Sequence, residues 1–130
     1  MARSIPEAAA DLIDGAKVMV HLATCDDGDP HVAPVWYGYD DGVVEVTTGG
    51  RKLANLRANP RVALSFQKDR AGETLWRVTA LGTAEVVDDE AALAAATRRI
   101  NRKYGVPEDA YRENTLVRVD LGSASHRTYE

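Results

Sequence analysis

Short runs of alternating apolar and polar residues, separated by tight-turn signals, constrain this chain more than any other feature. Residues 17–24 place an apolar side chain at every second position, and residues 43–48 are rich in β-branched side chains. Such alternation is typical of a strand with one buried face. Between these runs lie Asp26-Asp27-Gly28-Asp29 and Asp40-Asp41-Gly42, which favour hairpin turns. The pattern predicts an antiparallel meander with strands at 17–24, 31–39 and 43–48.

The rest of the chain adds further strands without the rhythm of a parallel sheet. Residues 61–67 alternate, and a long strand is predicted over 74–87 with Gly82 as a bulge or bend. Residues 115–121 form the last predicted strand, before a short extended tail. Closing a small antiparallel sheet removes its exposed edges. We therefore expect a mainly β fold, with about six strands in a partly closed antiparallel barrel.

Three peripheral helices are predicted from their end signals. Ser4-Ile5-Pro6-Glu7 resembles a capping box for a first helix that stops at Gly15. A short helix is expected over residues 51–58. Asp88 is predicted to cap the clearest helix, which Gly105 closes.

Composition limits the class of protein. The chain is 45% hydrophobic and 28% charged, which is typical of a folded protein, and 130 residues suffice for a single domain over 1–130. A net charge of −4 argues against a general nucleic-acid binder. The sequence has no apolar run of the roughly 18 residues that a spanning helix needs. Because Cys25 is the single cysteine and the N-terminus lacks a signal-peptide pattern, we expect a cytoplasmic protein without disulfides.

The segment most suggestive of binding is 47–56. A strand ends in two threonines, the second being Thr48, and two glycines ending at Gly50 precede a helix that begins with Arg51 and Lys52. Free amides at a helix N-terminus and a glycine-permitted close approach make an anion site. Cations are unfavourable there for the helix dipole unless an anion is bound. A phosphate site is one interpretation, and solvated charges beside a flexible turn are the other.

An aromatic pair follows a proline in the second predicted strand. Pro34-Val35-Trp36-Tyr37 places Pro34 and Trp36 on one face, and a proline within a strand favours an edge or a bulge. A large aromatic on an edge strand packs against a flat ring system or against a partner subunit. Taken from the residues alone, the partner subunit is favoured, because exposed aromatic side chains are enriched at interfaces.

Other side chains give no chemical signal. His21, His31 and His126 lack metal-ligand spacing, so no metal site is expected. Cys25 follows a strand and precedes two aspartates, whose charges disfavour a thiolate. The serines lack a nucleophile-elbow context. We identify no catalytic acid, base or nucleophile from the sequence.

Four ordered segments together resemble a known superfamily. They are 20–24, 30–36 with Pro-His-Val-Ala-Pro-Val-Trp, 47–56 with Thr-Thr-Gly-Gly-Arg-Lys-Leu-Ala-Asn-Leu, and 59–65. The set resembles the pyridoxamine 5′-phosphate oxidase-like superfamily, and more narrowly its flavin- and deazaflavin-dependent oxidoreductases common in actinobacteria. The resemblance implies a six-stranded split β-barrel, FMN-binding-protein-like, that forms a homodimer with a cofactor in each of two grooves between subunits.

The resemblance also implies a set of cofactor-binding residues. It places the cofactor phosphate on Gly50, Arg51 and Lys52, with Lys52 as the strongest single candidate. The remaining implied contacts are two residues near the phosphate, two along the ring system and one at a ring edge: Thr48, Asn55, Val35, Trp36 and Gln67.

The activity implied is hydride transfer from reduced deazaflavin, coenzyme F420, to a small organic acceptor. Two alternatives stay open: an FMN-dependent oxidase or reductase on the same fold, and a non-catalytic flavin, deazaflavin or haem-related binding protein. Many relatives end in a tryptophan, whereas this chain ends in His126-Arg127-Thr128-Tyr129, so the substrate is not predicted. A barrel of this size fills its own interior, which favours a cofactor site completed by a second chain.

Overall fold

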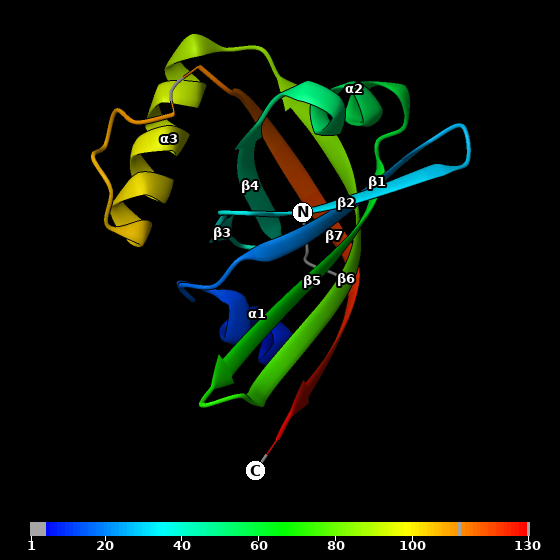
Figure 1. Cartoon of the computed structure of the whole chain (residues 1–130), viewed down its shortest axis with the longest axis vertical. Helices are drawn as coiled ribbons and strands as arrows, with labels where there is room; N and C mark the ends of the chain where they lie inside the picture. The colour runs from blue at the N-terminus through cyan, green and yellow to red at the C-terminus, as the bar shows by residue number, and fades with distance from the viewer. Residues whose placement is uncertain (1–4, 112, 130) are drawn as a thin grey trace.

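The computed structural model describes residues 5–111 and 113–129, which form three helices and seven strands (Figure 1). All paired strands are antiparallel and belong to one sheet, in the order β2-β1-β5-β6-β7-β4-β3. The mainly β architecture with peripheral helices is as the sequence predicts. The elements in chain order are α1 Glu7–Ile13, β1 Val20–Asp26, β2 Asp29–Val35, β3 Gly38–Asp40, β4 Val43–Thr48, α2 Gly50–Ala58, β5 Arg61–Arg70, β6 Glu73–Val87, α3 Glu90–Tyr104 and β7 Thr115–Thr128.

The sheet is curled because its two edge strands are consecutive in the sequence. β2 and β3 lie at opposite ends of the strand order, and Trp36 and Tyr37 alone connect them. Three Cα–Cα steps span at most about 11 Å, so the two edges must approach each other. The single strand predicted over 31–39 is therefore wrong, and the expected six strands become seven. The break is fixed by Tyr37, which is fully buried and donates its hydroxyl proton to the carbonyl oxygen of Ile13 at 2.6 Å.

The inner face of the curled sheet forms the core. Tyr37 packs edge-on against Phe66 with ring centroids 5.0 Å apart. Helix α1 adds Ala9 and Ile13, both fully buried, to the same cluster. The strands contribute apolar side chains at alternating positions, among them Val20, Leu22, Val44, Val46, Leu64, Val78, Val117 and Val119.

The longest ladder, β5-β6-β7, contains a bulge at the predicted position. The pairing of β6 with β7 shifts register between Leu81 and Gly82. A Cβ at Gly82 would lie 2.7 Å from the carbonyl oxygen of Asp120, so the close approach requires glycine. Beyond the bulge β7 continues to Thr128, paired with Trp76 of β6, so the segment expected as a short tail belongs to the sheet. In Figure 1 these strands project below the rest of the molecule.

The helix ends differ in detail from the sequence predictions. Asp89, not Asp88, caps α3: its Oδ1 accepts hydrogen bonds from the amides of Ala91 and Ala92 at 2.9 and 3.1 Å. Asp88 instead pairs with Arg57 at 3.5 Å. Gly105, with φ 75°, closes α3 as predicted.

Helix α1 ends at Ile13, two residues before Gly15. The predicted cap Ser4 lies outside the described residues. Among the residues that the structure describes, no helix is long and apolar enough to cross a membrane.

Candidate functional site

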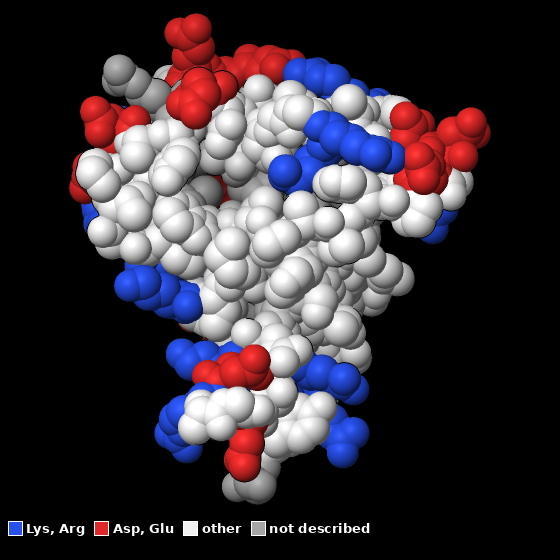
Figure 2. Space-filling view, viewed as in Figure 1, with Lys and Arg blue, Asp and Glu red and all other residues white. Residues whose placement is uncertain are grey.

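A cavity of about 540 Å³ opens where the ends of β2 and β4 meet the beginning of α2 and one side of α3. It brings together five of the eight cofactor-binding residues expected from the sequence: Val35, Trp36, Thr48, Gly50 and Lys52. They come from β2 and the connection after it, from β4 and from α2, because the closure of the sheet places the end of β2 beside the end of β4. Figure 2 shows a hollow in the upper part of the viewed face, with Lys and Arg side chains on its right-hand side.

One end of the cavity is suited to an anion. Thr48 is 3% exposed, and its Oγ1 has no hydrogen-bond partner among the described residues. Gly50, with φ 61°, turns the chain into α2, whose N-terminus is not capped by any side chain. Lys52 follows within the first turn and has no ion-pair partner in residues 5–111 and 113–129. A lysine, a threonine with an unpaired hydroxyl and an uncapped helix start therefore line the same cavity.

The opposite wall is aromatic. Trp36 stacks on Tyr104 of α3, with centroids 4.8 Å apart and planes 8° from parallel, and Tyr111 stands edge-on to it at 5.7 Å. The Tyr104 hydroxyl donates to the carbonyl oxygen of Val18 at 2.5 Å, which fixes the ring. One face of Trp36 is thus covered by Tyr104 of its own chain, and a ring system or a partner subunit would have to pack against the rest of the indole.

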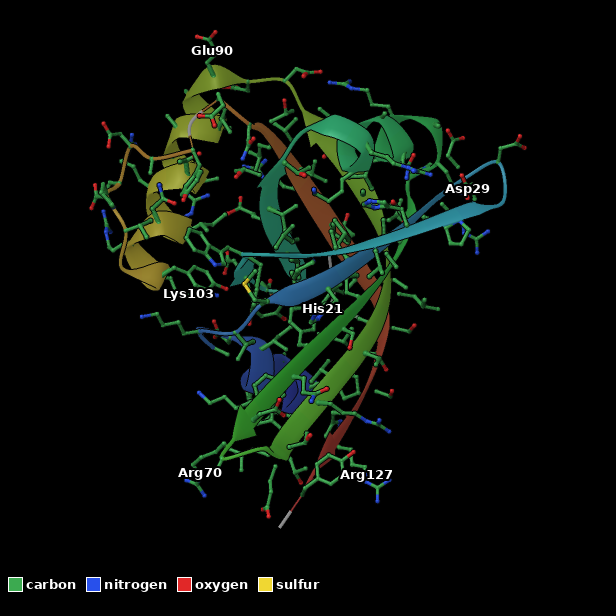
Figure 3. The ribbon with its side chains drawn as sticks, in the orientation of Figure 1. His21, Asp29, Arg70, Glu90, Lys103 and Arg127 are labelled. Carbon is green, nitrogen blue, oxygen red and sulfur yellow. The ribbon has the colours of Figure 1, made fainter. Side chains whose placement is uncertain are left out.

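Three expected site residues do not line this cavity. Arg51 is exposed and pairs with Asp29 at 2.9 Å, toward the β1–β2 hairpin, where Figure 3 labels Asp29. Asn55 is buried and donates from Nδ2 to Oγ1 of Thr24 at 3.0 Å, which joins α2 to β1.

Gln67 lies on the projecting part of β5. Its Nε2 donates to Asp69 at 2.9 Å and to Thr74 at 3.2 Å. Within one chain these bonds hold the β5–β6 hairpin rather than a ligand in the cavity.

Sequence reasoning missed the wall that α3 and the segment after it provide. Thr97 is 1% exposed, and its Oγ1 has no partner among the described residues. A threonine within an alanine-rich helix was the available signal, but nothing in the sequence placed α3 beside β4. The other members of this wall are Ile100, Asn101, Tyr111 and Asn114.

A second cavity, of about 700 Å³, lies against another face of α3 and is lined by Tyr37, Glu45 and Lys103. Glu45 accepts hydrogen bonds from Arg99 at 2.8 Å and from Arg118 at 3.1 Å. Lys103, labelled in Figure 3, places Nζ 3.6 Å from the centroid of the Tyr37 ring.

Burial shifts the titration of the groups around this second cavity. It lowers the pKa of Lys103 to about 8, against the opposing charge of Asp14. Burial also raises the pKa of Tyr104 to about 12 and that of Tyr37 well above its usual range. The ammonium of Lys103 is therefore held over aromatic rings rather than by a carboxylate.

Comparison with known families identifies the chain. Residues 5–121 match the model of the pyridoxamine 5′-phosphate oxidase family. The chain belongs to this family. The family and the split-barrel fold expected from the sequence are thereby confirmed, and a search of curated proteins gives no match.

Solved structures agree with this membership of the pyridoxamine 5′-phosphate oxidase family. An F420 reductase is 27% identical, with TM-score 0.75, over 92% of this chain and 98% of that one. The conserved hypothetical protein Rv2991 from Mycobacterium tuberculosis is also 27% identical, with TM-score 0.81, over 95% of this chain and 84% of that one. The heme storage protein HutZ from Vibrio cholerae, 19% identical with TM-score 0.73 over 97% and 94% of the two chains, shares the fold.

Proposed function

We propose that this protein is an oxidoreductase that uses reduced deazaflavin, coenzyme F420, to transfer hydride to a small organic acceptor. The observation that carries the proposal is the unpaired Lys52 and Thr48 beside the uncapped start of α2, in one cavity with Trp36. The likeness to an F420 reductase at 27% identity over 92% of this chain supports the deazaflavin over FMN.

The residues present fit a phosphate at the α2 end of the cavity. Burying a hydroxyl without a hydrogen-bond partner costs about 1–3 kcal/mol, and Thr48 has no protein partner among the described residues. A phosphate oxygen accepts the hydroxyl proton, pairs with the ammonium of Lys52, and lies favourably at the positive end of a helix. Gly50 has no side chain, and nothing lies within 4 Å of the position that a Cβ would take. The space beside its backbone is therefore open to a phosphate.

The rest of the cavity fits an aromatic ring system. Val35 and Trp36 supply apolar surface next to the phosphate end, and Tyr104 fixes the plane of Trp36. The cofactor supplies the hydride when bound, and the protein supplies binding, orientation and exclusion of water. The described lining has no carboxyl, imidazole or thiol group, and we propose water or the cofactor itself as the source of the proton for the product.

We further propose that the protein works as a homodimer that completes the cofactor site. The cavity is open on one side, and a barrel whose interior is filled by side chains leaves the ring system no internal site. A second chain is the simplest second wall.

Separate titrations of coenzyme F420 and of FMN into the protein, followed by a turnover assay with the reduced form of each, test the proposal. We expect tighter binding of coenzyme F420 and reduction of at least one acceptor in a panel of nitroaromatics, quinones and activated alkenes. Binding of FMN alone would replace the deazaflavin by a flavin on the same fold. Tight binding of coenzyme F420 with no acceptor reduced would indicate a carrier.

A further inference from the structure

Tyr111 holds a strained backbone conformation at the mouth of the cavity. Its φ is 62°, in the left-handed region that bulky side chains rarely adopt. Three other non-glycine residues have positive φ, namely Asp27, Asp41 and Ala71. Each of those precedes a glycine in a tight hairpin turn between paired strands, where positive φ is required. Tyr111 instead lies outside the paired strands, directly after the turn in which the Ala110 amide donates to the Pro107 carbonyl oxygen at 3.1 Å, and no glycine follows it.

The segment that carries Tyr111 is held in place by one buried side chain. Nδ2 of Asn101, on α3, donates to the carbonyl oxygens of Pro107, Glu108 and Ala110 at 3.0, 3.1 and 2.8 Å. Asn101 is only 2% exposed, so its side-chain amide is shielded from water and bonds to these carbonyl oxygens. The bonds end directly before Tyr111 and fix the direction in which its side chain leaves the segment.

The free energy gained by burying the Tyr111 side chain does not explain why the strained backbone is kept. The residue is 53% exposed, so folding removes only part of its surface from water. Its ring stands edge-on to Trp36, at 86° between planes, and lines the same cavity as Thr48 and Lys52. The fold thus holds an aromatic ring, at the expense of backbone strain, at the opening of the site. Strain of this kind is concentrated where a ligand is clamped.

We propose that Tyr111 is a binding residue that packs against the ring system of the bound cofactor, and that Asn101 is its positioning residue. This inference rests on the proposed function. It adds a contact from the segment between α3 and β7, far in sequence from the glycine-containing segment around Gly50.

Tyr111→Gly removes the aromatic ring and the backbone strain together, so it distinguishes an effect on cofactor binding from an effect on stability. Glycine adopts a φ of 62° without strain, so we expect the melting temperature to stay or to rise. The same variant should bind the cofactor at least tenfold more weakly, whereas Tyr111→Phe, which keeps the ring, should bind within about twofold of the wild type. Ala71→Gly is the matched control: it relieves positive φ in the β5–β6 turn, outside the cavity, and should leave affinity unchanged.

The role of Asn101 is tested by a double-mutant cycle measured with whichever of coenzyme F420 and FMN the wild type binds. Asn101→Ala should weaken binding in the wild-type background and have little further effect once Tyr111 is glycine. Additive losses of affinity would overturn the positioning role, because they would mean that Asn101 affects binding independently of Tyr111.

The outcomes separate this inference from the proposed function. Normal cofactor affinity in Tyr111→Gly, or a loss of affinity matched by a loss of melting temperature, would overturn the contact and leave the proposed function standing. Failure of the wild-type protein to bind either cofactor would overturn the proposed function, and the contact with it.

Discussion

Lys52 is the side chain on which cofactor binding should depend most. It lies in the first turn of α2 without a carboxylate partner in the described chain, beside the unpaired hydroxyl of Thr48. A hydrogen bond to a charged group contributes about 1.5–3 kcal/mol, so Lys52→Ala should weaken cofactor binding by about 10- to 100-fold. Because no other side chain depends on it, the free energy of unfolding should change by less than about 1 kcal/mol.

Isothermal titration of both proteins with the cofactor measures this effect, and thermal unfolding measures stability. Lys17→Ala, which removes an exposed lysine that does not line the cavity, is the control and should bind normally. Equal affinities of Lys52→Ala and the wild type would remove the phosphate assignment.

Lys103 should make stability increase with pH in the mildly alkaline range. Burial lowers its pKa from 10.5 to about 8 in the folded protein, and the nearby Asp14 only partly opposes this. Between these two values the unfolded chain binds more protons than the folded one, so the free energy of unfolding rises with pH. The raised pKa values of Tyr37 and Tyr104 act in the opposite sense, but only above about pH 10, where unfolded tyrosine ionises.

Urea unfolding of the wild type and of Lys103→Met at pH 7, 8 and 9.5 measures this linkage. The wild type should gain stability relative to the variant as pH rises. A constant difference across these pH values would mean that Lys103 keeps its ordinary pKa in the fold.

At the residue scale, the expected site residues that the cavity brings together at its α2 end are neighbours in the chain. Thr48, Gly50 and Lys52 are neighbours in the sequence, so a strand end, a glycine turn and a helix start bring them together without further information. Asn55 does not line the cavity, and its hydrogen-bond partner is Thr24, 31 residues away. When a side chain has two possible hydrogen-bond partners and one of them lies on another strand, the sequence does not show which partner it bonds to.

At the scale of elements, Gly82 should be the least replaceable glycine of the sheet. It occupies the bulge in β6, where a Cβ would lie 2.7 Å from both the Asp120 carbonyl oxygen and Cγ1 of Val119. Gly82→Ala forces the two strands apart and should destabilise the protein by about 1–3 kcal/mol.

Gly122, on the facing strand, provides the control for this substitution. A Cβ there would lie 3.8 Å from the Leu81 carbonyl oxygen, an ordinary contact, so Gly122→Ala should change stability by less than about 0.5 kcal/mol. Urea denaturation of the two variants compares them directly. Similar stabilities would mean that the bulge relaxes without loss.

Strands were predictable because each alternates independently of the others, and the helix ends were predicted approximately because caps are local, although Asp89 rather than Asp88 caps α3. The exception is the predicted strand over 31–39. The strand breaks at Trp36 and Tyr37 because Tyr37 is buried against Ile13 and Phe66. These contacts form only when the sheet closes. The sequence therefore predicts the elements well, and predicts poorly the point where the barrel splits. The cavity lies at that point, which is why the α3 wall was missed.

At the scale of the whole molecule, one face of the sheet is apolar and uncovered. A shallow groove of about 500 Å³ runs across β2, β1, β5, β6 and β7. Val32 and Leu81 in this groove are 62% and 60% exposed, and a contiguous exposed patch of this kind is typical of an interaction surface. Figure 2 shows a broad band without charged residues across the middle of the molecule, and Figure 3 labels His21 within it.

We expect this face to be buried in the homodimer proposed above. Val32→Glu combined with Leu81→Glu places two carboxylates in the groove, and like charges brought together across a symmetric interface cost several kcal/mol. Sedimentation velocity at micromolar concentration should show a dimer for the wild type and a monomer for the double variant. Ala91→Glu, which adds a carboxylate at the exposed start of α3, is the control and should remain dimeric.

Cofactor affinity measured on the same samples connects assembly to function. If a second chain supplies the missing wall, the monomeric variant should bind the cofactor more weakly although Lys52, Thr48 and Trp36 are unchanged. A wild-type monomer, or a monomeric variant with full affinity, would mean that the single chain holds its cofactor alone. In that case the 540 Å³ cavity, with Tyr111 at its mouth, would be the whole site.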